Sequence, residues 1–393
     1  MSARPPKAAV EANVLAWLIK SSGYSTNKIA QRVPVKLEKV EKWVAGEEQP
    51  SIAQVRKLAS LFKRPISDFF LPRPSSEPSM PHDFRRLPDD RLVTYSPALR
   101  NEIRSALLRR SMAIDLAQEL EEPIPEFQLR GTVQLRHDPE ALGSEIRRAL
   151  NVQIEEQRTW REPRVGYNGW RRKIEALGVL VLQTTTISKS EMLGFSLSYS
   201  LLPVIGINRK NKPNGRTFTL LHEFVHLLLG VGGICDLDEK VLRPPREQKT
   251  EVFCNHVAGA ALVPKEILQV HEIVRSNRDF DHWSEDSVRS LARHFCVSRI
   301  VVVRRLNMVG LASDAEYSRW QEMLQALMSK TDAEPKDDSE FKRNVPQEAV
   351  SNLGSFARLV ISSYESNLIN LRDASRMLGV RAEKVANVSD LLR

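Results

Sequence analysis

The chain has 393 residues, of which 41% are hydrophobic and 27% charged, the balance of an ordinary globular protein. No apolar run approaches the roughly 18 residues that a membrane span needs, and the Pro-rich, charged start is unlike a secretory signal peptide. Three cysteines, spread over positions 235, 254 and 296, argue against a disulfide framework. We therefore expect a cytoplasmic protein of two or three domains with no membrane partner.

Positive charge is concentrated near the N-terminus. The formal net charge is +9, and residues 1–75 contain 13 Lys and Arg against 6 Asp and Glu. Such an excess on a small domain favours an anionic partner, with nucleic acid as the first expectation. The alternative is a soluble basic surface with no specific partner.

Residues 8–72 are predicted to form a bundle of short helices. Apolar residues recur at helical spacing over 10–21. Ser25 is placed to cap a second helix, and Gly46 stands where a third helix would end. Ser51 is placed at the beginning of a fourth helix. The pattern therefore predicts four consecutive helices in the basic segment.

This helical segment resembles the Xre/Cro-type helix-turn-helix domain. The matching positions are Ile29, Ala30, Val35, Val40, Trp43, Gly46, Pro50 and Ser51. In that motif the second helix lies in the major groove. By position Lys36, Lys39 and Lys42 would then face DNA, where lysines mainly hold phosphates. Three positions depart from the usual pattern: Thr26, Pro34 and Val44. The alternative is a helical module for dimerisation or for docking a partner.

The next part of the chain is predicted to contain a linker, further helices and a small sheet. Residues 73–81 are rich in Pro and Ser, as a linker is. Helical spacing of apolar residues follows over 97–121 and 139–150. Three apolar runs predict strands: Ala176–Leu182, Met192–Ser198 and Pro203–Ile207. The second run alternates apolar and small polar residues, which is typical of an edge strand able to add a peptide as a further strand. A plain sheet edge is the alternative.

The run His222-Glu223-Phe224-Val225-His226 has the spacing H-E-x-x-H and carries the clearest chemical signal. Its apolar neighbours and Gly230 are typical of a helix that ends at the glycine. Residues four apart share one helix face, so both imidazoles can reach one cation, and neutral imidazoles suit Zn²⁺. Glu223 points aside, where it can accept a proton from a water molecule at the metal. The alternative is a buried helix that happens to carry two histidines.

A catalytic zinc site needs a third protein ligand. Residues 250–264 are predicted to form a second helix that carries Glu251 in its first turn. Cys254, three residues later, is a competing ligand. His256 is five residues after Glu251 and would point about 140° away on an ideal helix, which favours a packing role for this side chain.

Here the sequence resembles the ImmA/IrrE family of metallopeptidases. The chain reads H-E-F-V-H-L-L-L and then E-x-x-C-N-x-V-A-x-x-x-L-V-P, where the family has H-E-x-x-H and then E-x-x-A-N-x-F-A-x-x-L-L-x-P. The resemblance covers roughly residues 80–310 and includes the stretches His82–Arg85 and Val204–Asn208. The departures, which change packing and not the ligands, are Cys254, Val257 and Ala261.

The resemblance implies a zincin-like catalytic domain over residues 82–330. Its metal is expected to be Zn²⁺, with Mn²⁺ as a possible occupant of the same donors, and Glu223 is the implied general base. The implied metal ligands are His222, His226 and Glu251. Tyr199, on a predicted strand before the active helix, is a candidate to stabilise the oxyanion of a tetrahedral intermediate, although packing is the commoner role of an aromatic side chain on a strand.

Two features follow the catalytic helices. The sequence of residues 287–306 resembles a second helix-turn-helix. Members of the family often carry such a run after the catalytic helices, which favours a role in packing against the catalytic domain. Residues 331–345 are a predicted charged linker or loop, and 346–393 are predicted to be helical. The role of this C-terminal region is not indicated by its sequence.

These features predict a mostly α, α+β fold with an N-terminal helix-turn-helix bundle over 1–72, a catalytic domain with a small mixed sheet and a helical C-terminal region. The family implies a DNA-binding regulator and zinc endopeptidase that cleaves a repressor or antitoxin-type protein to switch on stress or mobile-element genes; a homodimer is compatible with this function. The rival hypothesis is a transcription regulator or antitoxin whose peptidase fold senses a ligand or partner without proteolysis. A purely structural metal site is a third possibility.

Overall fold

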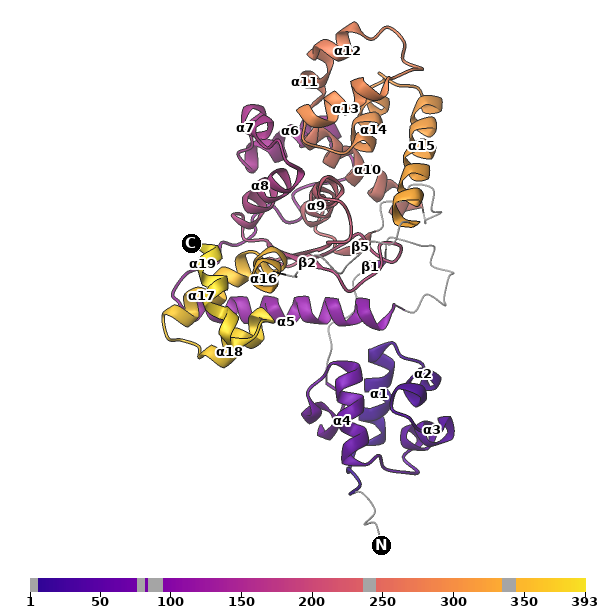
Figure 1. The fold of residues 1–393 in the computed structure, drawn as a ribbon, viewed down its shortest axis with the longest axis vertical. Helices are drawn as coiled ribbons and strands as arrows, with labels where there is room; N and C mark the ends of the chain where they lie inside the picture. The colour runs from indigo at the N-terminus through magenta and orange to yellow at the C-terminus, as the bar shows by residue number, and fades with distance from the viewer. Residues whose placement is uncertain (1–5, 76–81, 84–94, 236–244, 334–343) are drawn as a thin grey trace. The chain divides into compact units, whose positions relative to one another are not determined.

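The computed structural model describes residues 6–75, 82–83, 95–235, 245–333 and 344–393. They form many helices and one small mixed sheet (Figure 1), so the expected mostly α, α+β class is confirmed. Within this part of the chain no helix is both long enough and apolar enough to cross a membrane. The chain divides into two compact units, residues 1–80 with 90–107 and residues 81–89 with 108–393.

The N-terminal unit contains the predicted short helices. They are α1 (Ala12–Ser22), α2 (Thr26–Arg32), α3 (Leu37–Ala45), α4 (Ile52–Phe62) and the 3-10 turn η1 (Ile66–Phe70). The Ser25 hydroxyl caps α2, and Ser51 forms a reciprocal capping box with Gln54 at the start of α4. Gly46 ends α3 with a φ of 77°, a left-handed conformation that costs glycine little. Trp43 and Phe69 are buried in the core of this bundle.

Helix α5 (Pro97–Glu119) begins in the N-terminal unit and continues into the second one. Within the first unit Arg104 donates a hydrogen bond to the Phe62 carbonyl at 2.8 Å. Within the second unit Arg110 donates to the carbonyls of Leu201 and Leu202, at 2.7 and 3.0 Å. The linker predicted over residues 73–81 lies largely outside the described residues, which end at position 75 and resume at position 82.

The second unit contains a five-stranded sheet with the order β1-β5-β3-β4-β2. The strands are β1 (His82–Asp83), β2 (Leu180–Thr184), β3 (Gly194–Leu197), β4 (Val204–Asn208) and β5 (Gly233–Cys235). β3 pairs antiparallel with β4 on one side and with β5 on the other. The expectation that the 192–198 run is an edge strand is therefore wrong, because the short strand β5 occupies its free side. Among the described strands, β1 and β2 are the outer ones.

Helix α9 (Pro213–Leu228) lies against this sheet, on the same side as α8 (Pro163–Glu175) and α10 (Pro245–Leu262) (Figure 1). It contacts β3 and β4 on one side and both neighbouring helices on the other. Every residue of α9 from 216 to 228 is buried. A helix that is apolar around most of its surface is stable only inside a core, and α9 is the central helix of this unit.

Helices α6 (Pro139–Ala149) and α10 pack closely, and α14 (Arg299–Met308) fixes their ends. A Cβ added at Gly143 of α6 would lie 2.6 Å from the Ala260 Cβ of α10, so the two backbones are nearly in contact. Arg305 of α14 is completely buried, pairs with both carboxylate oxygens of Glu140 and donates to the Val263 carbonyl at 2.7 Å. The packing role expected of residues 287–306 is confirmed by these contacts.

The remaining helices complete the unit. They are α7 (Ile154–Thr159), α11 (Lys265–Val270), α12 (Glu272–Ser276), α13 (Glu285–His294), α15 (Asp314–Ala333), α16 (Val345–Leu353), α17 (Ser355–Glu365), α18 (Leu371–Leu378) and α19 (Val385–Leu392), with the 3-10 turn η2 (Ala382–Lys384). The predicted helical C-terminal region is thus confirmed. α16 and α17 pack against β2, which protects an outer strand whose backbone would otherwise be open to pairing. α15 continues to Ala333, past the start of the predicted linker, and most of that linker lies outside the described residues.

Candidate metal centre

Helix α9, which carries the two histidines, begins and ends at residues that suit a helix start and a helix end. Pro213 occupies the first turn, where its missing N–H costs nothing. Gly230, with a φ of 72°, follows the last turn, and the next amide, that of Val231, donates to the His226 carbonyl at 3.1 Å. This glycine-terminated end agrees with the sequence-based expectation.

Three side chains from two helices converge in the interior. His222 and His226 are on α9, Glu251 is on α10, and all three are buried. The two Nε2 atoms are 3.1 Å apart. His226 Nε2 lies 3.1 Å from Glu251 Oε1, and His222 Nε2 lies 3.4 Å from Glu251 Oε2. The structure therefore brings together the three residues predicted as ligands.

The spacing of these atoms fits a small divalent cation. All candidate ligand atoms lie within 4.8 Å of one another. Ligands about 2.0–2.1 Å from a tetrahedral zinc are about 3.3 Å from each other, close to the separations of 3.1 to 3.4 Å found here. Two imidazole nitrogens and a carboxylate are all electron-pair donors, so the group could bind a metal.

Asn255 orients the first histidine and was given no role by the sequence. Its Oδ1 lies 3.0 Å from His222 Nδ1. Because an amide oxygen only accepts, Nδ1 of His222 carries the proton and Nε2 presents its lone pair to the cluster. Such a partner fixes both the tautomer and the ring orientation of a metal-binding histidine. Its position four residues after Glu251, on the same helix face, is a signal that could have identified it.

The electrostatics of the cluster favour an ionised Glu251. Burial by itself would raise the pKa of this carboxyl, but the neighbouring imidazoles of His222 and His226 outweigh burial and hold the pKa well below its usual range. A charged carboxylate in the interior requires a partner of opposite charge. A divalent cation among these donors would provide that charge.

Glu223 lies beside the three donors and is kept apart from them. It is fully buried, and burial raises the pKa of its carboxyl while His226 and His222 oppose that rise. Ser196 of β3 faces it and favours the charged form only weakly. Neither carboxylate oxygen makes a hydrogen bond of normal geometry within the described part of the chain. A buried carboxylate without hydrogen bonds of normal geometry is typical of a functional site.

Strand β3 approaches Glu223 closely because residue 194 is a glycine. A Cβ added at Gly194 would lie 2.7 Å from Glu223 Oε1 and 2.6 Å from the Thr219 side chain. The backbone of β3 therefore forms the wall next to the carboxylate.

Comparison with known families agrees with this geometry. Residues 174–307 match the peptidase M78 family model, described as the IrrE N-terminal-like domain. The matched segment contains α9 and α10, and it supports the ImmA/IrrE resemblance for this part of the chain. Neither the curated proteins nor the solved structures compared with the chain gave a match.

The competing ligands are placed elsewhere or disfavoured. His256 Nε2 lies 2.8 Å from Glu140 Oε1, so this side chain joins α10 to α6. Cys254 is completely buried beside His226, and burial raises the pKa of its thiol against the opposing effect of that imidazole. The ligand atoms that converge in the described part of the chain belong to His222, His226 and Glu251, and Cys254 is not in this group.

Tyr199 differs from its prediction in both position and contact. It lies two residues beyond the end of β3 rather than on the strand. The guanidinium of Arg110 stacks over its ring at 3.9 Å, a cation–π contact. The structure therefore accounts for Tyr199 as a packing partner of α5, as the alternative interpretation holds.

The lysines predicted to face DNA are all at α3. Lys36 is the N-cap residue and is exposed, and Lys39 and Lys42 follow on the helix, where both are half-buried. Lys42 pairs with Glu38 at 2.9 Å. These three side chains belong to the N-terminal unit and stand apart from the buried residues of its core.

Proposed function

We propose that this chain is a metal-dependent peptidase of the ImmA/IrrE type that hydrolyses a peptide bond in a protein substrate. The observation that carries the proposal is the buried cluster of His222, His226 and Glu251 with the unengaged carboxylate of Glu223 beside it. The family match over residues 174–307 supports the same activity. A helix buried for packing alone would not carry His222, Glu223 and His226 on its buried surface, close to the Glu251 carboxylate of a second helix.

The ligand set favours zinc. His222, His226 and Glu251 would hold the cation and leave a further coordination position open, as catalytic zinc sites do. When bound, the cation would supply Lewis-acid activation of water and of the scissile carbonyl. Asn255 keeps the His222 ring in the orientation that this requires. Mn²⁺ is the alternative occupant of the same donors.

Glu223 is the residue that moves the proton. Its carboxylate accepts a proton from the attacking water and then donates it to the nitrogen of the leaving amine. Burial raises the pKa of Glu223, which makes the carboxylate a stronger base than an exposed glutamate. The absence of a competing hydrogen bond of normal geometry within the described residues leaves its oxygens available to water.

We propose further that the substrate is a single protein, of the repressor or antitoxin type, and that the N-terminal unit binds DNA. The basic N-terminal segment and the three lysines at α3 support DNA binding. Lys36, Lys39 and Lys42 would contact phosphates, so a triple alanine variant weakens binding to a random-sequence duplex and reduces the salt slope by up to roughly three charges.

A matched control for the DNA test removes the same charge elsewhere in the unit, at Lys20, Arg56 and Lys57, which are exposed. Fluorescence anisotropy over a series of salt concentrations measures both variants. Equal salt slopes for the two variants would contradict the assignment to α3 and favour a docking module.

The metal content of the purified protein tests whether the three proposed ligands bind a divalent ion. Purified protein should contain about one divalent ion per chain, measured by elemental mass spectrometry. Alanine at His222, His226 or Glu251 should abolish tight binding, whereas alanine at His256, which bonds to Glu140, should leave metal content unchanged. Full metal content in Glu251→Ala would move the third ligand elsewhere, with Cys254 next in position.

The rival hypothesis, a regulator that uses this fold as a sensor, predicts a different outcome. A sensor has no need of Glu223 for proton transfer, so Glu223→Gln would leave its regulatory behaviour unchanged. A purely structural metal site predicts unfolding when the metal is chelated, whereas a catalytic site predicts loss of activity with retained helix content.

A further inference from the structure

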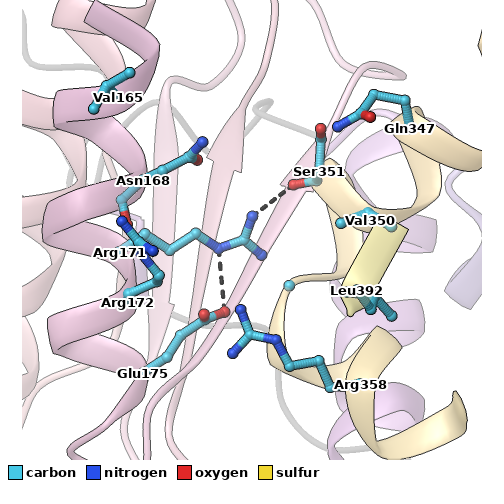
Figure 2. A pocket seen from close by; sticks show the side chains of 11 residues that line it. Val165, Asn168, Arg171, Arg172, Glu175, Gln347, Val350, Ser351, Arg358 and Leu392 are labelled. Carbon is cyan, nitrogen blue, oxygen red and sulfur yellow. Dashed lines mark hydrogen bonds and ion pairs between the residues drawn. The ribbon is translucent and has the colours of Figure 1, made fainter. Parts of the chain in front are cut away.

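A cavity lies where the C-terminal helices meet α8 (Figure 2). It has a volume of about 310 Å³. Its lining comes from α8, α16, α17 and α19, and no residue of the metal cluster contributes to it. This volume is at the lower end of the range typical of small-molecule sites, about 300–1,000 Å³.

One arginine of the cavity is fully engaged in holding the structure together. Arg171 donates to Glu175 Oε1 at 3.1 Å, to the Ser351 carbonyl at 2.6 Å and to the Val181 carbonyl of β2. Glu175 also accepts the amide of Ser355 at 3.1 Å. The Arg171–Glu175 pair is therefore electrically neutral and fixed in place, as Figure 2 shows for the bonds of Arg171 to Glu175 and Ser351.

Two further arginines line the cavity without a carboxylate partner in the described residues. Arg172 of α8 makes only a hydrogen bond of 3.3 Å to the Asn168 carbonyl in its own helix, and Arg358 of α17 makes no ion pair within the described part of the chain. Both side chains are exposed, and both line the cavity. The cavity thus has two uncompensated positive charges contributed by two separate parts of the chain.

The rest of the lining combines neutral polar and apolar groups. Asn168 and Gln347 offer amide groups, and Val165, Val350 and Leu392 offer apolar surface. A guanidinium group binds a phosphate or a carboxylate with two parallel hydrogen bonds. A phosphate monoester carries about −1.5 to −2 charges at pH 7, which matches two unpaired arginines better than a single carboxylate does.

The cavity wall is preorganised by bonds that also reach the active helix. Gln183 of β2 donates to the Ser351 carbonyl, and its own oxygen accepts from Arg216 in the first turn of α9. At the turn between α16 and α17, Gly354 has a φ of 54° and leaves no room for a Cβ beside Arg171. A site that is rigid before binding loses less entropy when a ligand enters.

We propose that this cavity is a binding site for a small phosphate monoester, held by Arg172 and Arg358 with its organic part against the valines and Leu392. The site goes beyond the proposed peptidase function, and its binding test does not depend on that function. The chemistry on which it rests is one dianionic group between two guanidinium groups.

Isothermal titration of the full-length protein tests this site. The probes are glycerol 3-phosphate, inorganic phosphate and acetate, each at matched ionic strength. We expect glycerol 3-phosphate to bind most tightly and acetate most weakly. The double variant Arg172→Ala/Arg358→Ala should weaken glycerol 3-phosphate binding by at least about 10-fold, since it removes both guanidinium groups that would donate charge-assisted hydrogen bonds to the phosphate.

A matched control, Arg372→Ala/Arg381→Ala, removes the same charge from exposed positions in the C-terminal region that do not line the cavity, and it should bind as the wild-type protein does. All four arginines are exposed, and circular dichroism verifies that both variants fold. Equal weakening in the two variants would mean a non-specific charge effect and overturn the proposal. Absence of glycerol 3-phosphate binding to the wild-type protein, or acetate binding as tight, would overturn it as well.

Discussion

The ion pair between Glu140 and Arg305 should contribute a large, pH-dependent share of the stability of the second unit. Burial would raise the pKa of Glu140, but hydrogen bonds from His256 and Arg305 outweigh burial and lower the pKa from 4.5 to about 2. Because the folded-state pKa is the lower one, this stabilisation is fully present above about pH 4.5. It is lost as the pH falls toward about 2.

The size of the effect follows from the shift and from the burial. Lowering the pKa of Glu140 from 4.5 to about 2 corresponds to roughly 3 kcal/mol of stabilisation, which we reduce to about 2 kcal/mol because the Glu140 side chain is 21% exposed. Arg305 is 0% exposed, and a buried charge that loses its partner costs about 3–5 kcal/mol. We therefore expect Glu140→Gln to destabilise the protein by between about 2 and 4 kcal/mol at pH 7.

Urea unfolding followed by circular dichroism at pH 7 and pH 4 measures this effect. The gap between wild type and Glu140→Gln should narrow at pH 4, since the wild-type glutamate then begins to lose its advantage. Glu285→Gln is the control, because Glu285 pairs with Arg299 at 2.7 Å but is 50% exposed, and its loss should cost less than about 1 kcal/mol. A Glu140→Gln variant as stable as wild type at pH 7, or a gap that widens at pH 4, would refute the reasoning.

Three further changes test the packing and the site. Gly143→Ala should destabilise the protein by about 1–3 kcal/mol in urea unfolding, because the new Cβ would lie 2.6 Å from that of Ala260. The control is Gly259→Ala, whose Cβ would meet nothing closer than 3.7 Å and which should be neutral or stabilising by up to about 1 kcal/mol. A Gly259→Ala variant less stable than Gly143→Ala would be inconsistent with the close α6–α10 contact. Gly194→Ala should keep its metal, but its rate of peptide cleavage should fall by at least about 10-fold, because the new methyl group displaces the Glu223 carboxylate. An undiminished rate would mean that β3 does not form the wall beside Glu223. Chelation should remove the metal and activity while far-UV circular dichroism stays unchanged, and loss of the helical signal would instead indicate a structural metal.

The local parts of the site were predictable from the sequence because they depend on helical periodicity. Four-residue spacing places His222 and His226 on one face, and the same spacing relates Glu251 to Asn255 on the neighbouring helix. The five-residue offset of His256 correctly indicated that it points away from the cluster. Such relations need only a helix and its period.

The pairing of β3 was not predictable for the opposite reason. Alternation of side chains shows that a strand has two different faces, but it does not show which strands lie on either side of it. The partner β5 has three residues, Gly233–Cys235, too few to give a periodic signal. The contacts of Arg171 with Ser351 join residues 180 positions apart, and a single sequence contains no local signal for them.

The central claim is that Glu223 serves as the proton acceptor at a buried metal site, and Glu223→Gln tests it most directly. Glutamine keeps the size and the helix propensity of the side chain but removes the base, so metal content and folding should be retained. Proteins from cells that express wild type or Glu223→Gln can be compared by mass spectrometry of their new termini. We predict a protein that is cut in wild-type cells and intact with Glu223→Gln, with cleavage reduced by about 10²–10⁴-fold. Equal cleavage with both forms, at equal metal content, would contradict the peptidase function.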